Sequence, residues 1–285
     1  SHNRAFMIGV ALNLAFVIVE AAFGLITDSL ALVADAGHNL GDVLGLVLAW
    51  GGALLAKRRA TARRTYGWRR ATILAALLNA VILYLAVGAI GWEAVRRLFD
   101  PPQAAGTTVM LVAGVGIVIN TATALMFAAG RKSDLNVGGA FLHMAADAAV
   151  SAGVVLAGLG IVITGWLWLD PAISLVVAGV ILIGTWRLMR ESVNLAMDAV
   201  PAGIDADRIK RYLEDLPGVA RVHDLHIWAM STTETALTAH LEHHGSADTQ
   251  RLTRDAGNHL DHHFGIVHST LQWERISWSG QRSCG

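Results

Sequence analysis

The sequence predicts a membrane all-α bundle of six transmembrane helices, followed by a small C-terminal α+β domain with the order αββαβ. Three observations lead to this fold class. Hydrophobic residues make up 54% of the 285 residues and charged residues only 15%, whereas soluble domains carry about 25% charged residues. Six long apolar stretches follow one another. The composition then becomes polar and mixed near Pro201.

Each apolar stretch is near or above the roughly 20 residues that a helix needs to cross a bilayer. The stretches occupy residues 5–26, 30–56, 71–95, 107–130, 137–165 and 168–189. Their connections are short, which favours a tight bundle. Small residues inside the spans allow helix backbones to approach closely, and they include Gly41, Gly45, Gly114, Gly116, Gly153 and Gly158.

The basic residues between the spans predict the orientation, because cytoplasmic loops carry an excess of Lys and Arg. One side of the membrane receives Arg4, Lys57, Arg58, Arg59, Arg63, Arg64, Arg69, Arg70, Arg131, Lys132, Arg187 and Arg190. The other side receives Asp28, Asp100 and Asp170, and its only basic residues are Arg96 and Arg97. We therefore expect both termini in the cytoplasm.

The polar C-terminal part predicts a small sheet with both helices on one face. Asp205 is a candidate N-cap for a helix that runs to about residue 216, before the Pro217–Gly218 pair. Strands are expected over 220–229, 234–243 and 267–275, with a helix over 247–264 between the last two. We expect a transmembrane domain over 1–197, a cytoplasmic domain over 198–279 and a tail over 280–285.

Two His-x-x-x-Asp pairs lie within the apolar spans, His38 with Asp42 and His143 with Asp147. A four-residue offset places both side chains of a pair on one helix face. Two such helices that face each other would form an N2O2 cage, which suits a tetrahedral divalent cation such as Zn²⁺. Ionisable residues at membrane depth are costly and usually functional. The alternative is that His–Asp hydrogen bonds simply join the helices.

Further polar residues lie near these pairs or on neighbouring spans. Asp35 either orients an imidazole from outside the ligand set or starts a helix. Glu20 either belongs to a water or proton path or pairs with a neighbouring helix. The remaining candidates for this path are Asn39 and Asn120. Because metal binding requires neutral imidazole, protons and metal compete for the same nitrogen atoms.

The polar domain contains nine of the twelve histidines. A second metal site is expected from His223, His240, His268 and Glu274. His268 and Glu274 have the same parity on the third strand, so they face one side of the sheet. For most other exposed histidines, a solvated surface residue is the simpler interpretation, and the doublets at 243–244 and 262–263 are only further candidates.

Several other functions lack support in the sequence. A His-Glu-x-x-His motif and a Gly-rich phosphate loop are both absent, which argues against a zincin hydrolase and against ATP drive. The single cysteine, Cys284, excludes an internal disulfide and a cysteine-based zinc site. The basic run 57–70 is interpreted as a topology signal and lipid-headgroup contact rather than a nucleic-acid patch.

Four segments resemble the cation diffusion facilitator family, especially its bacterial zinc, cobalt and cadmium efflux branch and the vesicular zinc transporters. They are TDSLALVADAGHNLGD at 27–42, TYGWRRATIL at 65–74, VHDLHIW at 222–228 and HSTLQWE at 268–274. The resemblance covers essentially the whole chain. It implies a homodimer with ferredoxin-like cytoplasmic domains, located in a bacterial inner membrane.

The resemblance also implies proton-coupled export of Zn²⁺, with Cd²⁺ or Co²⁺ as further substrates. It makes His38, Asp42, His143 and Asp147 the transport site, and it maps a regulatory metal site onto His223 and His240. Some members bind metal in the loop between spans two and three. Here residues 57–70 contain no Asp, Glu or His, so we expect no site there.

Two functions of other classes remain open. A membrane metal sensor would bind ions in its histidine-rich domain without moving them. An intramembrane zinc hydrolase would need three protein ligands, an open water position and a general base. A cage with four protein ligands argues against the hydrolase.

Overall fold

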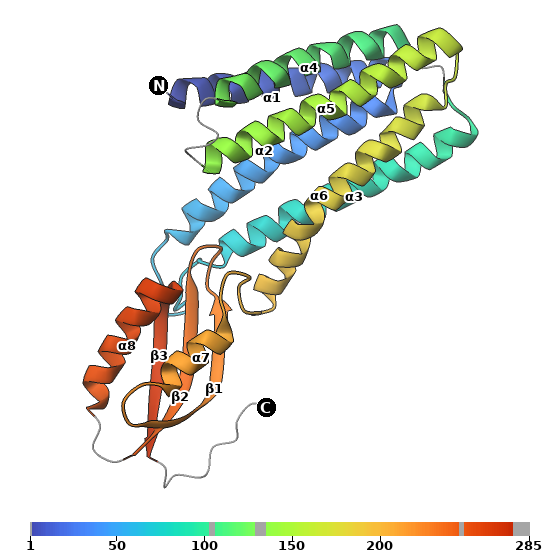
Figure 1. Ribbon diagram of the computed structural model, residues 1–285. Coiled ribbons are helices and arrows are strands. Elements are labelled where there is room, and N and C mark those ends of the chain that lie inside the picture. Colours follow the sequence, from blue (N-terminus) through green and yellow to red (C-terminus); the bar gives the residue numbers. More distant parts are fainter. Residues whose placement is uncertain (1, 103–105, 129–134, 245–247, 276–285) are drawn as a thin grey trace. The chain divides into compact units, whose positions relative to one another are not determined.

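The computed structural model describes residues 2–102, 106–128, 135–244 and 248–275, with side chains from residue 14 onward except 126–128 and 135–143. Six helices come first, in the predicted order (Figure 1). They are α1 (His2–Ile26), α2 (Leu30–Ala56), α3 (Ala71–Phe99), α4 (Gly106–Ala128), α5 (Leu135–Thr164) and α6 (Leu169–Ala196). The predicted tail 280–285 and the basic residues Arg131 and Lys132 lie outside the described residues.

Five of these helices are long and apolar enough to cross a membrane. Within the described side chains, the part of α1 at Leu14–Ile26 is a shorter apolar helix. Two helices extend beyond the predicted spans: α3 reaches Phe99 instead of residue 95, and α6 reaches Ala196 instead of 189. The added turns contain charged residues. A hydropathy pattern marks where a span leaves the apolar layer, whereas backbone hydrogen bonding continues beyond it.

Close contacts divide the chain into two units, residues 1–47 with 79–187 and residues 48–78 with 188–285. The division cuts through α2, α3 and α6, so the domain boundary expected at 197/198 stays a prediction.

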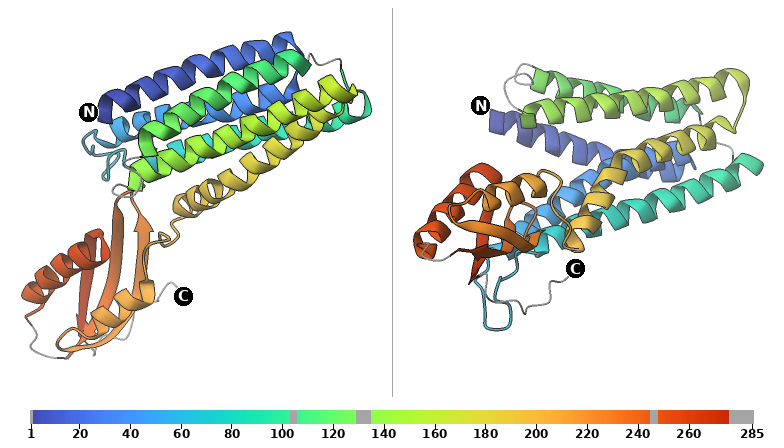
Figure 2. Two further views of the ribbon diagram at one scale, coloured as in Figure 1. Left: turned by 45° about the horizontal axis from the view of Figure 1, so that its top comes forward. Right: turned by 60° about the horizontal axis from the view of Figure 1, so that its bottom comes forward.

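The first unit contains most of the helix bundle, in which α4 packs against both α5 and α1 (Figure 2). One apolar cluster joins Phe16 of α1, Leu32 of α2, Val109 of α4 and Val154 of α5. A second cluster joins α2, α3 and α6 through Ala34, Val87, Val177, Ala178 and Ile181. Leucine, isoleucine and valine side chains also cover the outside of the helices, as expected for surfaces that face lipid.

Close helix approach depends on glycine at some of the predicted positions. A Cβ atom at Gly41 of α2 would lie 2.2 Å from Leu83 Cδ2 of α3. A Cβ atom at Gly158 of α5 would lie 3.0 Å from the backbone oxygen of Gly106 in α4. Gly114, in contrast, has open space beside it. Small residues therefore permit the α2–α3 and α4–α5 contacts, whereas Gly114 has no such role among the described residues.

The second unit ends in the predicted αββαβ arrangement. Its elements are α7 (Ala206–Glu214), β1 (Val219–Ala229), β2 (Thr235–His243), α8 (Thr249–Phe264) and β3 (Ile266–Arg275). The strand order is β1–β2–β3, with β1 antiparallel and β3 parallel to β2. A parallel neighbour requires a crossover connection, which α8 supplies.

Both helices pack on one face of this sheet, as predicted. The core contains Ile209 and Leu213 of α7, Leu260 of α8, and Leu237 and Leu241 of β2. The predicted N-cap is confirmed, because the Asp205 side chain accepts a hydrogen bond from the Arg208 backbone N–H at 3.0 Å. The second helix begins at Thr249, two residues later than expected, because Asp248 caps it by accepting from Arg251.

Aromatic rings join α7 to α8 at the edge of this core. The ring of His259 stacks on Tyr212 at 4.1 Å and on His263 at 4.2 Å between centroids. Desolvation by burial, followed by the charges of His263 and Arg208, lowers the pKa of His259 below 6.5. A neutral His259 can stack without bringing a second positive charge next to Arg208.

Candidate metal centre

The predicted ligands on α2 and α5 come together inside the first unit. His38 Nε2 lies 3.5 Å from Asp147 Oδ1 and 4.0 Å from Asp42 Oδ2. Asp147 is 1% exposed, whereas the side chain of Asp42 is 37% exposed. His143 belongs to α5, but its side chain lies outside the described residues. Three of the four predicted ligands are therefore close to one another.

The predicted neighbours of these ligands form a buried polar layer. Glu20 of α1, Asp35 of α2 and Asn120 of α4 are each 0% exposed, and Asn39 is 6% exposed. The Asn39 side-chain amide donates to the backbone oxygen of Asp35 at 3.1 Å. The carboxylate of Glu20 is close enough to Asp35 and Asp147 to interact with both.

One member of this layer was not predicted from the sequence. Ser151 of α5 is fully buried and donates its hydroxyl hydrogen to Asp35 Oδ2 at 3.0 Å. A signal was present in the sequence, because Ser151 follows Asp147 by four residues and so shares its helix face. Ser151 thereby holds Asp35 next to the ligands.

The composition of this layer determines its chemistry. Glu20, Asp35 and Asp147 are buried carboxylic acids in a bundle of apolar helices, and an unpaired charge in such surroundings is costly. A cation bound among these acids would offset that cost. Imidazole nitrogen and carboxylate oxygen are ligands of Zn²⁺ and related divalent ions.

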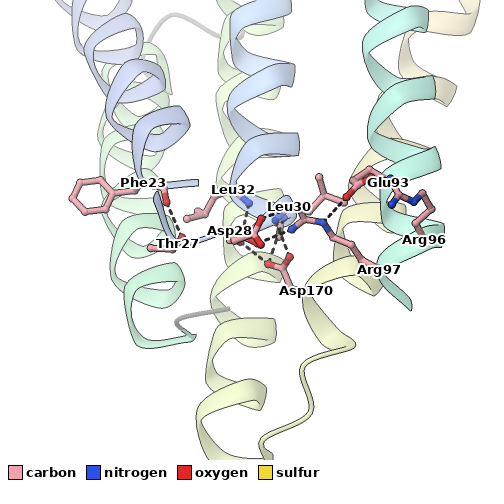
Figure 3. Close-up of polar contacts among 11 residues, drawn as sticks. Phe23, Thr27, Asp28, Leu30, Leu32, Glu93, Arg96, Arg97 and Asp170 are labelled. Atoms are coloured by element: carbon pink, nitrogen blue, oxygen red, sulfur yellow. Dashed lines mark hydrogen bonds and ion pairs between the residues drawn. The ribbon is translucent and has the colours of Figure 1, made fainter. Parts of the chain in front are cut away.

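A buried cap fixes the beginning of α2, the helix that carries His38 and Asp42. Asp170 of α6 accepts hydrogen bonds from Ser29 Oγ at 2.5 Å, from Leu30 N at 2.8 Å and from Ala31 N at 3.4 Å (Figure 3). The first backbone N–H groups of a helix have no partner within it, and Asp170 supplies one from another helix. From the sequence alone, Asp170 was only a marker of orientation.

The two arginines that departed from the charge pattern also lie at this end of the bundle. Arg97 Nη2 contacts Asp28 Oδ1 at 2.7 Å and Arg97 Nε contacts Glu93 Oε1 at 3.0 Å (Figure 3). Arg96 Nη1 lies 3.1 Å from Glu93 Oε2. Acidic neighbours thus offset both positive charges, which explains why they do not conform to the loop pattern.

A second cluster lies on the open face of the sheet in the other unit. His240 Nδ1 lies 2.8 Å from Glu274 Oε1, and His223 Nε2 lies 3.3 Å from Glu274 Oε2. The ring centroids of His223 and His240 are 5.3 Å apart. These three residues offer ligand atoms within 4.8 Å of one another. Strand pairing explains this, because His223 is directly opposite His240.

His268 does not join this cluster. It pairs with Ala236 in the sheet, whereas Glu274 pairs with Glu242, and its ring contacts Tyr66 at 5.7 Å between centroids. The equal parity of His268 and Glu274 correctly predicted that both side chains lie on one face of β3. The two residues are six positions apart, however, which corresponds to about 20 Å along a strand. The expectation that His268 lies beside the other three residues is therefore wrong in geometry.

Two acids that the sequence analysis did not single out lie beside the cluster. Asp224 Oδ2 is 3.6 Å from His240 Nε2, and Glu242 Oε1 is 3.6 Å from His223 Nε2. Asp224 has a φ of 51°, in the left-handed region, at an irregularity of β1. A strand bulge redirects a side chain, and periodicity alone does not reveal it.

The histidines of the two doublets lie elsewhere: His243 packs on Trp273, and His262 and His263 are exposed on α8.

Comparison with known proteins gives a consistent result. The cation efflux transmembrane domain family matches residues 6–195, and the cation efflux protein cytoplasmic domain family matches residues 201–276. The chain is 36% identical over 274 residues to the metal cation efflux system protein CzcD of Cupriavidus metallidurans, covering 96% of this chain and 87% of that protein.

Two further relatives have similar coverage. A cadmium, cobalt and zinc/H(+)-K(+) antiporter of Bacillus subtilis is 33% identical, over 96% of this chain and 89% of its own length. Zinc transporter ZitB of Escherichia coli is 34% identical, over 96% and 88%. The solved metal-bound C-terminal domain of the CzcD transporter is 29% identical with a TM-score of 0.24, covering 25% of this chain and 99% of that structure. Together, the two family matches and the full-length relatives show that the chain belongs to the cation diffusion facilitator family of membrane metal-efflux transporters.

Proposed function

We propose that this protein is a proton-coupled antiporter that exports Zn²⁺ from the cytoplasm, with Cd²⁺ and Co²⁺ as further substrates. Transport proceeds by alternating access around His38, Asp42, His143 and Asp147. The observation that carries the proposal is the approach of His38 Nε2 to Asp147 Oδ1 at 3.5 Å, because it joins the two His–Asp helices at one point.

The ligand spacing supports this assignment. Zinc–nitrogen and zinc–oxygen bonds of about 2.0–2.1 Å in a tetrahedron place neighbouring ligand atoms about 3.3 Å apart. The distances from His38 Nε2 to the two carboxylates are 3.5 and 4.0 Å. Small side-chain movements would therefore be enough for both acids and the imidazole to bind one ion.

Proton coupling follows from the same donor set. A ligating imidazole must be neutral, so acid on the far side favours protonation of the histidines and release of the metal. Glu20 and Asp35 add protonatable groups beside the ligands, and Asn39 and Asn120 provide polar neighbours along the path. The Bacillus subtilis relative is named a cadmium, cobalt and zinc/H(+)-K(+) antiporter, which supports coupling to H⁺.

The remaining elements of the proposal concern assembly and placement. The name of the cytoplasmic family model, a dimer domain, supports a homodimer. We place the protein in a bacterial inner membrane with both termini in the cytoplasm, where the basic segment 57–70 lies. The domain boundaries 1–197 and 198–279 are part of this proposal, as is the absence of a nucleic-acid partner.

Zinc flux into proteoliposomes with an imposed pH gradient tests the function. We expect Zn²⁺ to accumulate in vesicles with an acidic interior, and the accumulation to collapse when an ionophore dissipates the gradient. Cadmium, cobalt and manganese are compared in the same assay. Zinc binding without gradient-driven flux in sealed vesicles would favour a membrane metal sensor, the alternative that the cytoplasmic cluster makes plausible.

We further propose that His223, His240 and Glu274 bind a regulatory metal ion in the cytoplasmic domain. Glu274→Gln should weaken this site by at least about tenfold, because the buried carboxylate bridges both imidazoles and a metal site with a lost ligand binds poorly. Equilibrium dialysis of the full-length protein with Zn²⁺ measures the change. Glu242→Gln is the matched control, since Glu242 is 3.6 Å from His223 and lies at the edge of the cluster. Equal zinc affinity in Glu274→Gln and the unmodified protein would contradict the assignment.

A further inference from the structure

A cavity of about 770 Å³ lies within the second unit, and its lining includes no residue of either metal cluster. Three segments distant in the sequence line it. The segment between α2 and α3 contributes most of the wall, the loop between β1 and β2 contributes Ser231, Thr233 and Glu234, and β3 contributes His268. Cavities of about 300–1,000 Å³ are typical of small-molecule sites.

The charged residues that line this cavity are mostly basic. Lys57, Arg58, Arg59 and Arg69 line it, and Glu234 is the only acid among the lining residues that the structure describes. Arg69 Nη1 lies 3.1 Å from Glu234 Oε2, so these two charges offset each other. Within the described part of the chain, Lys57, Arg58 and Arg59 have no acidic partner at ion-pair distance. Three positive charges are therefore left for a ligand.

The walls are held together before any ligand arrives. The backbone N–H of Thr232, in the loop between β1 and β2, donates to Thr72 Oγ1 at the start of α3 at 3.0 Å. The rings of Tyr66 and His268 meet edge to face at 5.7 Å. Together with the Arg69–Glu234 ion pair, these contacts join the basic segment to the end of the sheet. The site is preorganised, which lowers the entropic cost of binding.

The cavity also lies next to the ends of two helices that are long enough to span the membrane. The cavity is lined by Ala53 and Ala56 in the last turns of α2, and the next spanning helix, α3, begins at Ala71. Nearby, the guanidinium of Arg64 lies 3.9 Å from the ring centroid of Trp68. Tryptophan and basic side chains at the ends of spanning helices are typical of the headgroup layer.

We propose that this cavity binds a phosphate group, supplied by the headgroup of an anionic phospholipid. Guanidinium groups form paired hydrogen bonds with phosphate oxygens, and the hydroxyl groups of Thr65, Tyr66 and Thr233 are further donors among the lining residues. Ala53 and Ala56 give the cavity a small apolar wall against which the first carbon atoms of an acyl chain would pack. A bound headgroup thus joins the loop between α2 and α3 to the cytoplasmic sheet. This inference does not depend on which metal the protein transports.

Native mass spectrometry of the full-length protein in detergent tests the proposal, with phosphatidylglycerol, phosphatidylcholine and inorganic phosphate as separate probes. We expect saturable retention of phosphatidylglycerol and little retention of phosphatidylcholine. Arg58→Gln combined with Arg59→Gln should weaken retention about 25-fold, since each basic residue near anionic lipid contributes about fivefold. Arg251→Gln combined with Arg254→Gln on exposed α8 removes the same charge and should have no effect. Equal losses in the two double variants would overturn the site.

A second pair of variants separates a built site from general attraction between charges. Glu234→Gln removes the acid that pairs with Arg69 and so frees this guanidinium, which should strengthen phosphatidylglycerol retention about fivefold. Asp255→Asn on α8 makes the same change of charge elsewhere and should leave it unaltered. Identical effects of these two substitutions would contradict a defined pocket. If inorganic phosphate displaces phosphatidylglycerol at equal concentration, the ligand is free phosphate and the lipid source is wrong.

Discussion

Replacing Asp147 with asparagine is expected to reduce zinc flux by at least about 100-fold. Loss of a residue that only supports a metal ligand typically costs 10- to 100-fold in affinity or activity, and Asp147 is proposed as a ligand itself. Its carboxylate is 3.5 Å from His38 Nε2 and almost completely buried, so water cannot easily replace it. Initial rates of zinc uptake into proteoliposomes under a fixed pH gradient measure the effect.

The substitution keeps the shape of the side chain, so folding should survive. Because asparagine has nearly the volume of aspartate, the melting temperature in metal-free buffer should stay close to that of the unmodified protein. Asp207→Asn, at an exposed position of α7, is the matched control and should transport normally. If the Asp147→Asn variant took up zinc at a rate within twofold of that of the unmodified protein, the proposed transport site would be contradicted.

Asp170→Ala is expected to destabilise the helix bundle by about 3 kcal/mol. The substitution removes the acceptor for Ser29 Oγ, Leu30 N and Ala31 N, which are all buried. Hydrogen bonds to a charged group contribute about 1.5–3 kcal/mol each to stability, and buried donors left without an acceptor add a desolvation penalty. The melting temperature in detergent should fall by roughly 5–10 °C. Zinc flux should fall as well, because the cap fixes the helix that carries His38 and Asp42.

The nearby Asp28–Arg97 ion pair provides the comparison. Asp28 is 58% exposed, and exposed ion pairs contribute only about 0–1 kcal/mol. Asp28→Asn keeps a residue type that tolerates the positive φ of 54° at this position. We therefore expect a change in stability within about 1 kcal/mol. A larger loss in Asp28→Asn than in Asp170→Ala would show that the exposed pair, rather than the buried cap, secures the beginning of α2.

The site residues were predictable to different degrees, and the reasons are physical. His38 and Asp42 share a face of α2 by helix geometry alone, so their spacing was informative. That α5 meets α2 at this depth required the packing of the bundle, which brings Asp147 to His38. Ser151 and Asp170 were missed because each acts on a residue of another helix. Serine and aspartate occur in many structural roles, so the roles of Ser151 and Asp170 become clear only when their hydrogen-bond partners on the other helix are known.

The sheet illustrates the same limit. The alternation of side chains along β3 correctly placed His268 and Glu274 on one face of the sheet. The register of the strands, however, separates these two residues and brings Glu274 next to His223 and His240. Register depends on the contacts of the whole sheet and on the irregularity near Asp224. The cavity beside Arg58 and Arg59 is a similar case, because the sequence reveals the basic run but not the strand loop that closes it.

By itself, the sequence determined the number and order of the helices and strands, the face of β3 that His268 and Glu274 share, and the histidine–aspartate pairs. These properties follow from local periodicity and from the length of apolar runs, which neighbouring residues fix. Only the tertiary structure decided which pairs meet, which acid caps α2 and which histidine leaves the cytoplasmic cluster. Those outcomes depend on contacts between residues far apart in the sequence, such as Ser29 and Asp170, which are 141 positions apart. Local periodicity carries no information about such contacts.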